Sequence, residues 1–454
     1  MRHNETANVN EEFLNGSIPS VVIKNALPAV IAMVMVMVYN LADTFFISLT
    51  HDDYQIAAIS FAAPVFMIFM SLGTLFGVGG TSVISRALGA NDTDRAKNAS
   101  SFCTFASIGV GVFIMAIIWI FSEPFAIALG AGENTLGYTL TYLRITVCCG
   151  VFSMLSNCHS NILRAEGAAM KAMTGTLIGN LVNIVLDAVF VMIFNWGIKG
   201  VAVATVIGNI IGALYYLLHF ISGKSSLSIK HKDFSTKGNI LKDVVSIGIS
   251  ASLANLLVSL STMIVNSRLS AYGELYVAAY GVTAKVLMIV SMIGIGIGAG
   301  VQPIIGFCYG GRHKERFFGY IKFSVLLASA VCIVISLLCL IFAKPIVTVF
   351  LTDSSAWNAA IHFTKIMLTT AWLTGAFVVL QNTMQAMGAA MPALLASLFR
   401  QAIIFIPVVF LMQVIFDMDG LIFAQPVADV LSLVIIIFML IRLLSKENAA
   451  ESQS

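Results

Sequence analysis

Residues 165–170 read Ala-Glu-Gly-Ala-Ala-Met, and residues 386–391 read Ala-Met-Gly-Ala-Ala-Met, 221 positions later. The same offset relates Gly73 to Gly294 and Pro124 to Pro345. The chain therefore contains two copies of one structural unit. In a strongly apolar chain, such a duplication indicates two equivalent helical bundles, an arrangement typical of membrane transporters.

The composition excludes a water-soluble fold. The chain is 59% hydrophobic and only 10% charged, whereas soluble domains carry about 25% charged residues. Most of the apolar surface must therefore face membrane lipids. A net charge of +3 gives no case for a nucleic-acid partner. The seven cysteines lie in or beside apolar runs without zinc-type spacing, so we expect buried thiols and no cofactor.

Twelve apolar runs are long enough to cross a bilayer, which takes about 20 residues in a helix. They lie near 20–48, 55–85, 97–121, 138–162, 170–194, 198–221, 242–269, 276–306, 317–342, 358–386, 392–415 and 420–443. We therefore expect an all-α membrane protein with twelve transmembrane helices in two six-helix bundles. An even number of spans gives both repeats one orientation, so a pseudo-two-fold axis along the membrane normal should relate the bundles.

One polar segment divides the chain. We expect an N-terminal bundle at 1–221, a linker at 222–241 and a C-terminal bundle with a short tail at 242–454. Loops on the side of the linker are rich in Arg and Lys, and the alternate loops hold mainly acids. The positive-inside rule then predicts a multi-pass membrane protein with the linker and both termini in the cytoplasm.

Two acidic residues fall well inside apolar runs of the first half. Asp43 and Asp187 should each lie roughly 10–14 Å below the outer surface, given a rise of about 1.5 Å per helical residue. Thr205 reaches a similar depth from the same surface. Asn180, Asn183 and Asp187 share one helix face because of their i, i+3, i+7 spacing. We expect Asp43, Asn180, Asp187 and Thr205 to form one cluster.

This cluster suits two chemistries. Two desolvated carboxylates side by side favour proton uptake, which would make one of them a proton carrier. Carboxylate, amide and hydroxyl oxygens together could instead hold a hard cation, so Na⁺ is the one metal ion we consider. The structural alternative is that Asp43 is solvated near the outer loop and Asp187 pairs with a backbone or amide donor. The second bundle is expected to be polar but not acidic.

Several motifs resemble those of the multidrug and toxic compound extrusion (MATE) transporters. They are Leu27-Pro28 with Leu41-Ala42-Asp43-Thr44, the glycine-rich stretch at 76–90, Asn183-Ile184-Val185-Leu186-Asp187, and Gly200-Val201-Ala202-Val203-Ala204-Thr205. The resemblance covers nearly the whole chain, and its bacterial MepA-like branch is the most similar, which implies a location in a bacterial inner membrane. It implies twelve helices, a V-shaped central cavity and export of organic cations in exchange for H⁺ or Na⁺. It also implies that Asp43, Asn180, Asp187 and Thr205 bind the coupling ion.

The NorM-like branch of this family carries further acids in the seventh and tenth helices. This chain has none in either run, which favours coupling through the first bundle alone. In this family the first, second and eighth helices border the cavity. We expect the substrate to contact Tyr39, Asn40, Met67, Met70, Asn183, Lys285, Met288 and Met292, because flexible thioethers suit promiscuous apolar binding. Pro28 is the expected hinge, since proline frees a backbone carbonyl and allows a bend.

The expected function is therefore secondary multidrug antiport by a monomer whose partners are small drugs or metabolites and membrane lipids. A dedicated metabolite exporter or a lipid-precursor flippase remains open as an alternative. An intramembrane enzyme would need a nucleophile with a base, or a metal cluster, and no HExxH, GxSxG or Cys/His constellation occurs in the sequence.

Overall fold

The computed structural model describes residues 11–50, 52–223, 225–350 and 356–451. Within these ranges the chain is helical apart from its turns and short connections. This follows from the composition, because a helix satisfies its own backbone hydrogen bonds where no water is available.

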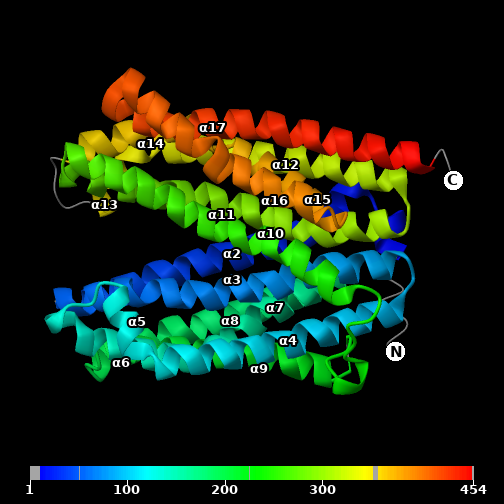
Figure 1. The fold of residues 1–454 in the computed structure, drawn as a ribbon, viewed down its shortest axis with the longest axis horizontal. Helices are drawn as coiled ribbons and strands as arrows, with labels where there is room; N and C mark the ends of the chain where they lie inside the picture. Colours follow the sequence, from blue (N-terminus) through cyan, green and yellow to red (C-terminus); the bar gives the residue numbers. More distant parts are fainter. Residues whose placement is uncertain (1–10, 51, 224, 351–355, 452–454) are drawn as a thin grey trace.

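The helices form two lobes that follow the two halves of the sequence (Figure 1). The first lobe comprises α2 (Ile18–Ser48), α3 (Asp53–Gly89), α4 (Thr93–Ile120), α5 (Ser122–Ala128), α6 (Glu133–Cys148), α7 (Gly150–Ala165), α8 (Ala169–Asp187), the π-helix η1 (Ala188–Ile193) and α9 (Ile198–Ile221). The second lobe comprises α10 (Ile240–Leu269), α11 (Glu274–Gly310), α12 (Lys314–Ile341), α13 (Ala343–Phe350), α14 (Trp357–Ala371), α15 (Leu373–Ala386), α16 (Ala390–Leu398), the π-helix η5 (Phe399–Ile403) and α17 (Phe405–Glu451).

Among the described residues, nine helices are long and apolar enough to cross a membrane, and two bent helix pairs add one span each. The last of the nine, Ala390–Glu447, contains a break at Asp417, where φ is 55°. Dividing it there gives twelve spans, six in each lobe. The prediction of an all-α membrane protein with twelve transmembrane helices is confirmed.

The structure differs from the sequence prediction within two spans. The runs at 138–162 and 358–386 were expected as continuous helices, but each is bent, by 47° between α6 and α7 and by 44° between α14 and α15. At the first bend the N–H of Cys149 bonds to the carbonyl of Thr146, three residues back, instead of four. This tighter turn redirects the helix axis. Both bends fall at nearly equivalent positions of the repeat.

The two lobes lie close together at one end of the molecule and diverge toward the other (Figure 1). We call the end that carries the connecting segment 222–239 the linker end, and the opposite end the far end. At the linker end, α3 and α11 cross backbone to backbone. A Cβ atom on Gly89 would overlap the carbonyl oxygen of Phe307, and a Cβ on Gly310 would overlap that of Arg86. Glycine at both positions is therefore what permits this approach.

This crossing obeys the repeat. Gly310 is the repeat partner of Gly89, and Phe307 is the repeat partner of Arg86, so the two close contacts are symmetric copies of each other. Further contacts join the lobes nearby: the Ser82 hydroxyl donates to the carbonyl of Gln385, and Arg95 forms an ion pair with Asp243 at 2.8 Å. The lobes are therefore sealed together at the linker end.

The linker packs against the first lobe. Glu166, at the end of α7, accepts hydrogen bonds from the Ser225 hydroxyl at 2.7 Å and from the backbone N–H and hydroxyl of Ser226. The Ser101 hydroxyl of α4 donates to the carbonyl of Lys230 at 2.7 Å. Phe234 lies against Phe102 and Phe105 of the same helix. Residues 225–234 are therefore held by α4 and by the end of α7.

Replacing Gly89 with alanine should weaken the crossing. The added methyl would push against the backbone of α11, which has no flexible atom to move aside, and overpacking of this kind costs about 1–3 kcal/mol. We expect the thermal unfolding temperature of purified Gly89→Ala protein to fall by several degrees. Gly109→Ala is the matched control, since a Cβ there meets nothing within 4 Å. Equal unfolding temperatures for the two variants would contradict the role assigned to this crossing.

Candidate functional site

Three helices of the first lobe bring the predicted cluster together. Asp43 lies on α2, Asn180, Asn183 and Asp187 lie on α8, and Thr205 lies on α9. The helices α8 and α9 approach closely through small residues: a Cβ on Gly208 would be 2.8 Å from the Cβ of Asn183. This close packing leaves Asn183, Asp187 and Thr205 at most 3% exposed.

Asn183 connects the members of the cluster. With its amide oriented to satisfy both of its polar atoms, its NH₂ group donates to Oδ1 of Asp43 at 3.2 Å, and its oxygen accepts from the backbone N–H of Thr205 at 3.1 Å. The Thr205 hydroxyl donates to the carbonyl of Val201 at 2.9 Å. One amide therefore joins α2, α8 and α9 through the polar atoms of the site.

The two carboxyl groups face each other. Asp187 is fully buried, and neither of its oxygens receives a hydrogen bond from any donor in the described chain. Its interaction is with the side chain of Asp43. Two carboxylates are both acceptors and cannot bond to each other, but a carboxyl and a carboxylate can share one proton. The pair therefore has a place for one positive charge.

Two tyrosines lie beside this site. Tyr39, which was expected to contact substrate, lies one turn before Asp43 on α2 and interacts with the Asp43 carboxyl. Tyr142 of α6 lies close enough to interact electrostatically with both Asp43 and Asp187. Sequence reasoning missed Tyr142. The available signal was a polar aromatic residue inside the apolar run at 138–162, but the depth of that run was uncertain because of its bend.

Asn180 is adjacent to the cluster and contributes differently from Asn183. Its side-chain nitrogen is buried and makes no hydrogen bond within the described residues. Buried amides are nearly always paired, so an unsatisfied one is unusual. Among the described residues, no group of three or more His, Cys, Asp or Glu side chains is placed to hold a metal ion. A cation here would depend on two carboxylates together with amide and hydroxyl oxygens.

The residues predicted to contact substrate are distributed over α2, α3, α8 and α11. Asn40 is exposed and donates to the carbonyl of Val36. Met67 is half exposed, and its sulfur lies 4.0 Å from the hydroxyl of Ser259 on α10, across the space between the lobes. Met70 instead accepts a hydrogen bond from Ser153 of α7, inside the first lobe.

The remaining members of this group lie on α11 and α2. On α11, Lys285 is exposed, and Met288 and Met292 are partly buried. On α2, Pro28 is buried, and the helix continues through it without interruption from Ile18 to Ser48. The predicted hinge therefore lies within one continuous helix in this conformation.

The expectation that the second lobe lacks a buried acid is wrong. Asp429 of α17 is 5% exposed and forms an ion pair with Arg400 of η5 at 3.0 Å. Arg400 also donates to the hydroxyl of Thr374 at 2.9 Å and lies over the ring of Phe377. Gln425 donates to the same oxygen of Asp429. Asp429 falls inside the apolar run at 420–443, so the cost of an acid in lipid could have identified it. Its pairing with Arg400 could not be predicted, because the two residues come from separate helices.

The Arg400–Asp429 pair should be essential to the stability of the second lobe. Removing one partner leaves an uncompensated charge inside the membrane, which costs about 3–5 kcal/mol in buried pairs. We expect Asp429→Asn to lower the thermal unfolding temperature strongly and the double variant Arg400→Met/Asp429→Leu to recover most of the loss. If the Asp429→Asn protein is as stable as the wild type, Asp429 is not needed to compensate the buried charge of Arg400.

Comparisons with known proteins agree with this architecture. The protein-family model described as MatE matches residues 28–189 and 251–411, one match in each lobe. "Multidrug export protein MepA" of Staphylococcus aureus strain MSSA476 is 30% identical over 418 residues, covering 91% of this chain and 92% of that protein. The protein of the same name from Staphylococcus saprophyticus is 27% identical over 423 residues.

Solved structures share the fold. "Crystal structure of MATE in complex with MaL6" has a TM-score of 0.90 at 24% identity and covers 96% of this chain and 99% of that one. A transporter of the MOP superfamily from Pyrococcus furiosus, described as having a binding pocket of reverse polarity, has a TM-score of 0.86 at 24% identity, covering 94% and 97%. The family match in both lobes, the relatives of nearly full length and the twelve-helix fold lead to one conclusion: this chain belongs to the MatE family, the multidrug and toxic compound extrusion transporters.

Proposed function

We propose that this protein is a multidrug antiporter that exports amphipathic organic cations in exchange for H⁺ or Na⁺. It acts as a monomer in the lipid bilayer, without an enzymatic step. Membership of the MatE family and the multidrug export proteins among the relatives support this activity. The buried Asp43–Asp187 pair is the observation that carries the coupling mechanism, because it is a site that gains stability when one cation arrives.

The proposed orientation places the linker end and both termini in the cytoplasm of a bacterial cell. The basic residues of the loops at 86–97, 164–171 and 312–322 support it, since they occur on the same side as the linker. In that orientation the seal between α3 and α11 closes the cytoplasmic side. The acid pair then lies in the half of the first lobe that faces outward.

Either coupling ion can be accommodated by the chemistry of the cluster. A proton would bridge the Asp43 and Asp187 carboxyls and remove their mutual repulsion. Na⁺ would take carboxylate oxygens of the same pair, with the amide oxygen of Asn183 and the hydroxyl of Thr205 as further ligands. An inward-moving cation releases about 2.3 kcal/mol per charge for every 100 mV of membrane potential, and this energy drives export.

The acid pair is connected to the rest of the molecule through α2. The NH₂ group of Asn183 donates to a carboxyl oxygen of Asp43. A proton or Na⁺ that binds this carboxyl competes for the same oxygens, so it changes the hydrogen bond that joins α2 to α8. Pro28 lies about four turns nearer the linker end on the same helix, at a position without an intrahelical N–H donor. We propose that cation binding shifts α2 relative to α8 and that Pro28 accommodates the bend.

Neutralising either acid should stop export. We expect Asp43→Asn and Asp187→Asn each to reduce drug resistance in an efflux-deficient bacterial host to the level of the empty vector, with unchanged amounts of protein in the membrane. Glu123→Gln is the matched control, since Glu123 is an exposed acid at the far end. Wild-type resistance in both Asp variants would contradict the coupling site.

Transport measured in proteoliposomes tests the function itself. A pH gradient and a Na⁺ gradient, each imposed alone, should show which ion drives uptake of a fluorescent organic cation. Transport that responds to neither gradient would reject antiport. Transport of one metabolite but no other organic cation would favour a dedicated exporter, and translocation of a lipid-linked precursor would favour a flippase.

A further inference from the structure

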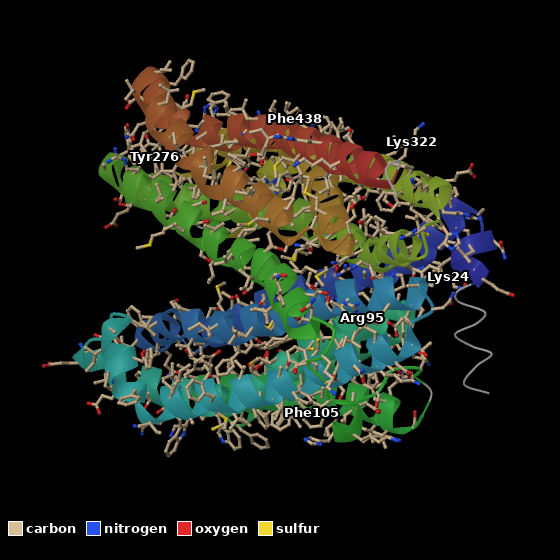
Figure 2. All side chains as sticks on the ribbon, turned by 45° about the vertical axis from the view of Figure 1, so that its right-hand side comes forward. Lys24, Arg95, Phe105, Tyr276, Lys322 and Phe438 are labelled. Atoms are coloured by element: carbon tan, nitrogen blue, oxygen red, sulfur yellow. The ribbon has the colours of Figure 1, made fainter. Side chains whose placement is uncertain are left out.

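A cavity lies far from the acid pair, at the linker end between the two lobes. It has a volume of about 520 Å³. Its walls come from the ends of α3 and α4 in the first lobe and from α11, α12 and α17 in the second. We call it the seam pocket. Figure 2 shows Arg95, one of its lining residues, near the linker end where the lobes meet.

The seam pocket is electropositive. Its cationic side chains are Arg86, Arg95, Arg312 and Lys314, and its acids are Asp92 and Glu447. The acids are already engaged: Asp92 caps α4 by accepting from the backbone N–H of Arg95, and Glu447 accepts from the hydroxyl of Tyr309. Asp243, which is ion-paired with Arg95, adds a third acid beside the lining, so four cations face three acids and one positive charge remains unbalanced.

Two of the guanidinium groups have donors to spare. Arg86 is fixed by a bond from its Nε to the carbonyl of Ser82 and by packing against Gly388. Within the described chain its two terminal nitrogens make no hydrogen bond, and Arg312 makes no side-chain bond at all. A guanidinium presents five N–H donors in a planar fork that matches the oxygens of a phosphate group. The arrangement therefore suits a phosphate better than a compact monatomic anion.

The rest of the lining indicates what else the ligand can carry. Phe317, Phe318 and Leu444 give the second-lobe wall an apolar surface beside the cations. The volume exceeds that of a phosphate group alone, so there is room for the alcohol to which the phosphate is esterified. Basic pockets between transmembrane helices bind anionic head groups in this way.

We propose that the seam pocket binds a phosphate-bearing anion and that this anion joins the two lobes at the linker end. Arg86 reaches it from the first lobe and Arg312 from the second, so the bound phosphate bridges the two guanidinium groups that have unused donors. Since the pocket lies beside the Gly89–Gly310 crossing, its occupancy favours the conformation in which the lobes are sealed there. The phosphate can come from a lipid head group or from a soluble phosphate compound.

Variants of two arginines test the bridge. Arg86→Gln removes a charge but keeps an amide that can donate to the carbonyl of Ser82, and it leaves the Arg95–Asp243 ion pair between the lobes intact. Arg312→Asn preserves the backbone, because Arg312 has a positive φ of 57° and its repeat partner is Asn91, with a φ of 59°. Lys322→Gln is the control, an exposed basic residue of α12 outside the pocket (Figure 2).

Binding is measured by calorimetry on the purified full-length protein, at constant ionic strength, with two probes. One is a short-chain phosphatidylglycerol below its micellar concentration, and the other is inorganic pyrophosphate. We expect at least one probe to bind the wild type and the Lys322→Gln control equally. Each of Arg86→Gln and Arg312→Asn should weaken that binding by about tenfold or more, as the loss of a charge-assisted bond predicts.

The pattern of binding identifies the source of the phosphate. Binding of phosphatidylglycerol alone assigns the pocket to lipid head groups, binding of pyrophosphate alone assigns it to soluble phosphates, and binding of both supports the shared chemistry. The proposal is overturned if neither probe binds, if both variants bind as the wild type does, or if only one of the two arginines matters. Unchanged thermal unfolding of the variants ensures that weaker binding reflects the lost charge. The readout is independent of transport, so it stands apart from the antiport proposal.

Discussion

The backbone contact between α3 and α11 is the constraint on which the arrangement of the lobes depends. Gly89 and Gly310 let each helix approach the carbonyl of the other at symmetric positions, so the two repeats meet on their own pseudo-two-fold axis. Because the contact involves backbone atoms, side-chain rotation cannot relieve it. In this conformation the lobes are held together at the linker end and separate toward the far end (Figure 1). The acid pair lies in the first lobe, near the C-terminal ends of α2 and α8.

The two lobes differ in how their buried acidic side chains are compensated. In the second lobe, Arg400 stays beside Asp429, with Thr374 and Gln425 satisfying the remaining bonds. In the first lobe, Asp43 and Asp187 face each other without a basic side chain in the set of groups that interact with them. A permanent arginine makes the second network structural. The first network has no such basic partner, and under the antiport mechanism that we propose it is the lobe that responds to the ion gradient.

The sequence was sufficient for features that depend on local pattern or on the repeat. Run length predicted the spans, and the offset of 221 residues predicted two like bundles. The cost of an acid in lipid identified Asp43 and Asp187, and helical spacing placed Asn183 beside Asp187. The approach of Tyr142 and the pairing of Arg400 with Asp429 were not predictable, because each depends on the rotation of one helix against another. The bend at Cys149 was missed because an apolar run carries no signal for a changed hydrogen-bond register.

The linker has a mechanical consequence that follows from where it is held. Residues 225–234 are bound to the first lobe by Glu166, Ser101 and the ring of Phe105, so they travel with that lobe as a rigid part of it. Only residues 235–239 connect Phe234 to the first residue of α10, Ile240. Six Cα steps span at most about 20 Å when fully extended. The Cα atoms of Phe234 and Ile240 therefore stay within this distance of each other in every conformation. This limits how far the two lobes can separate at the linker end while a substrate passes between them.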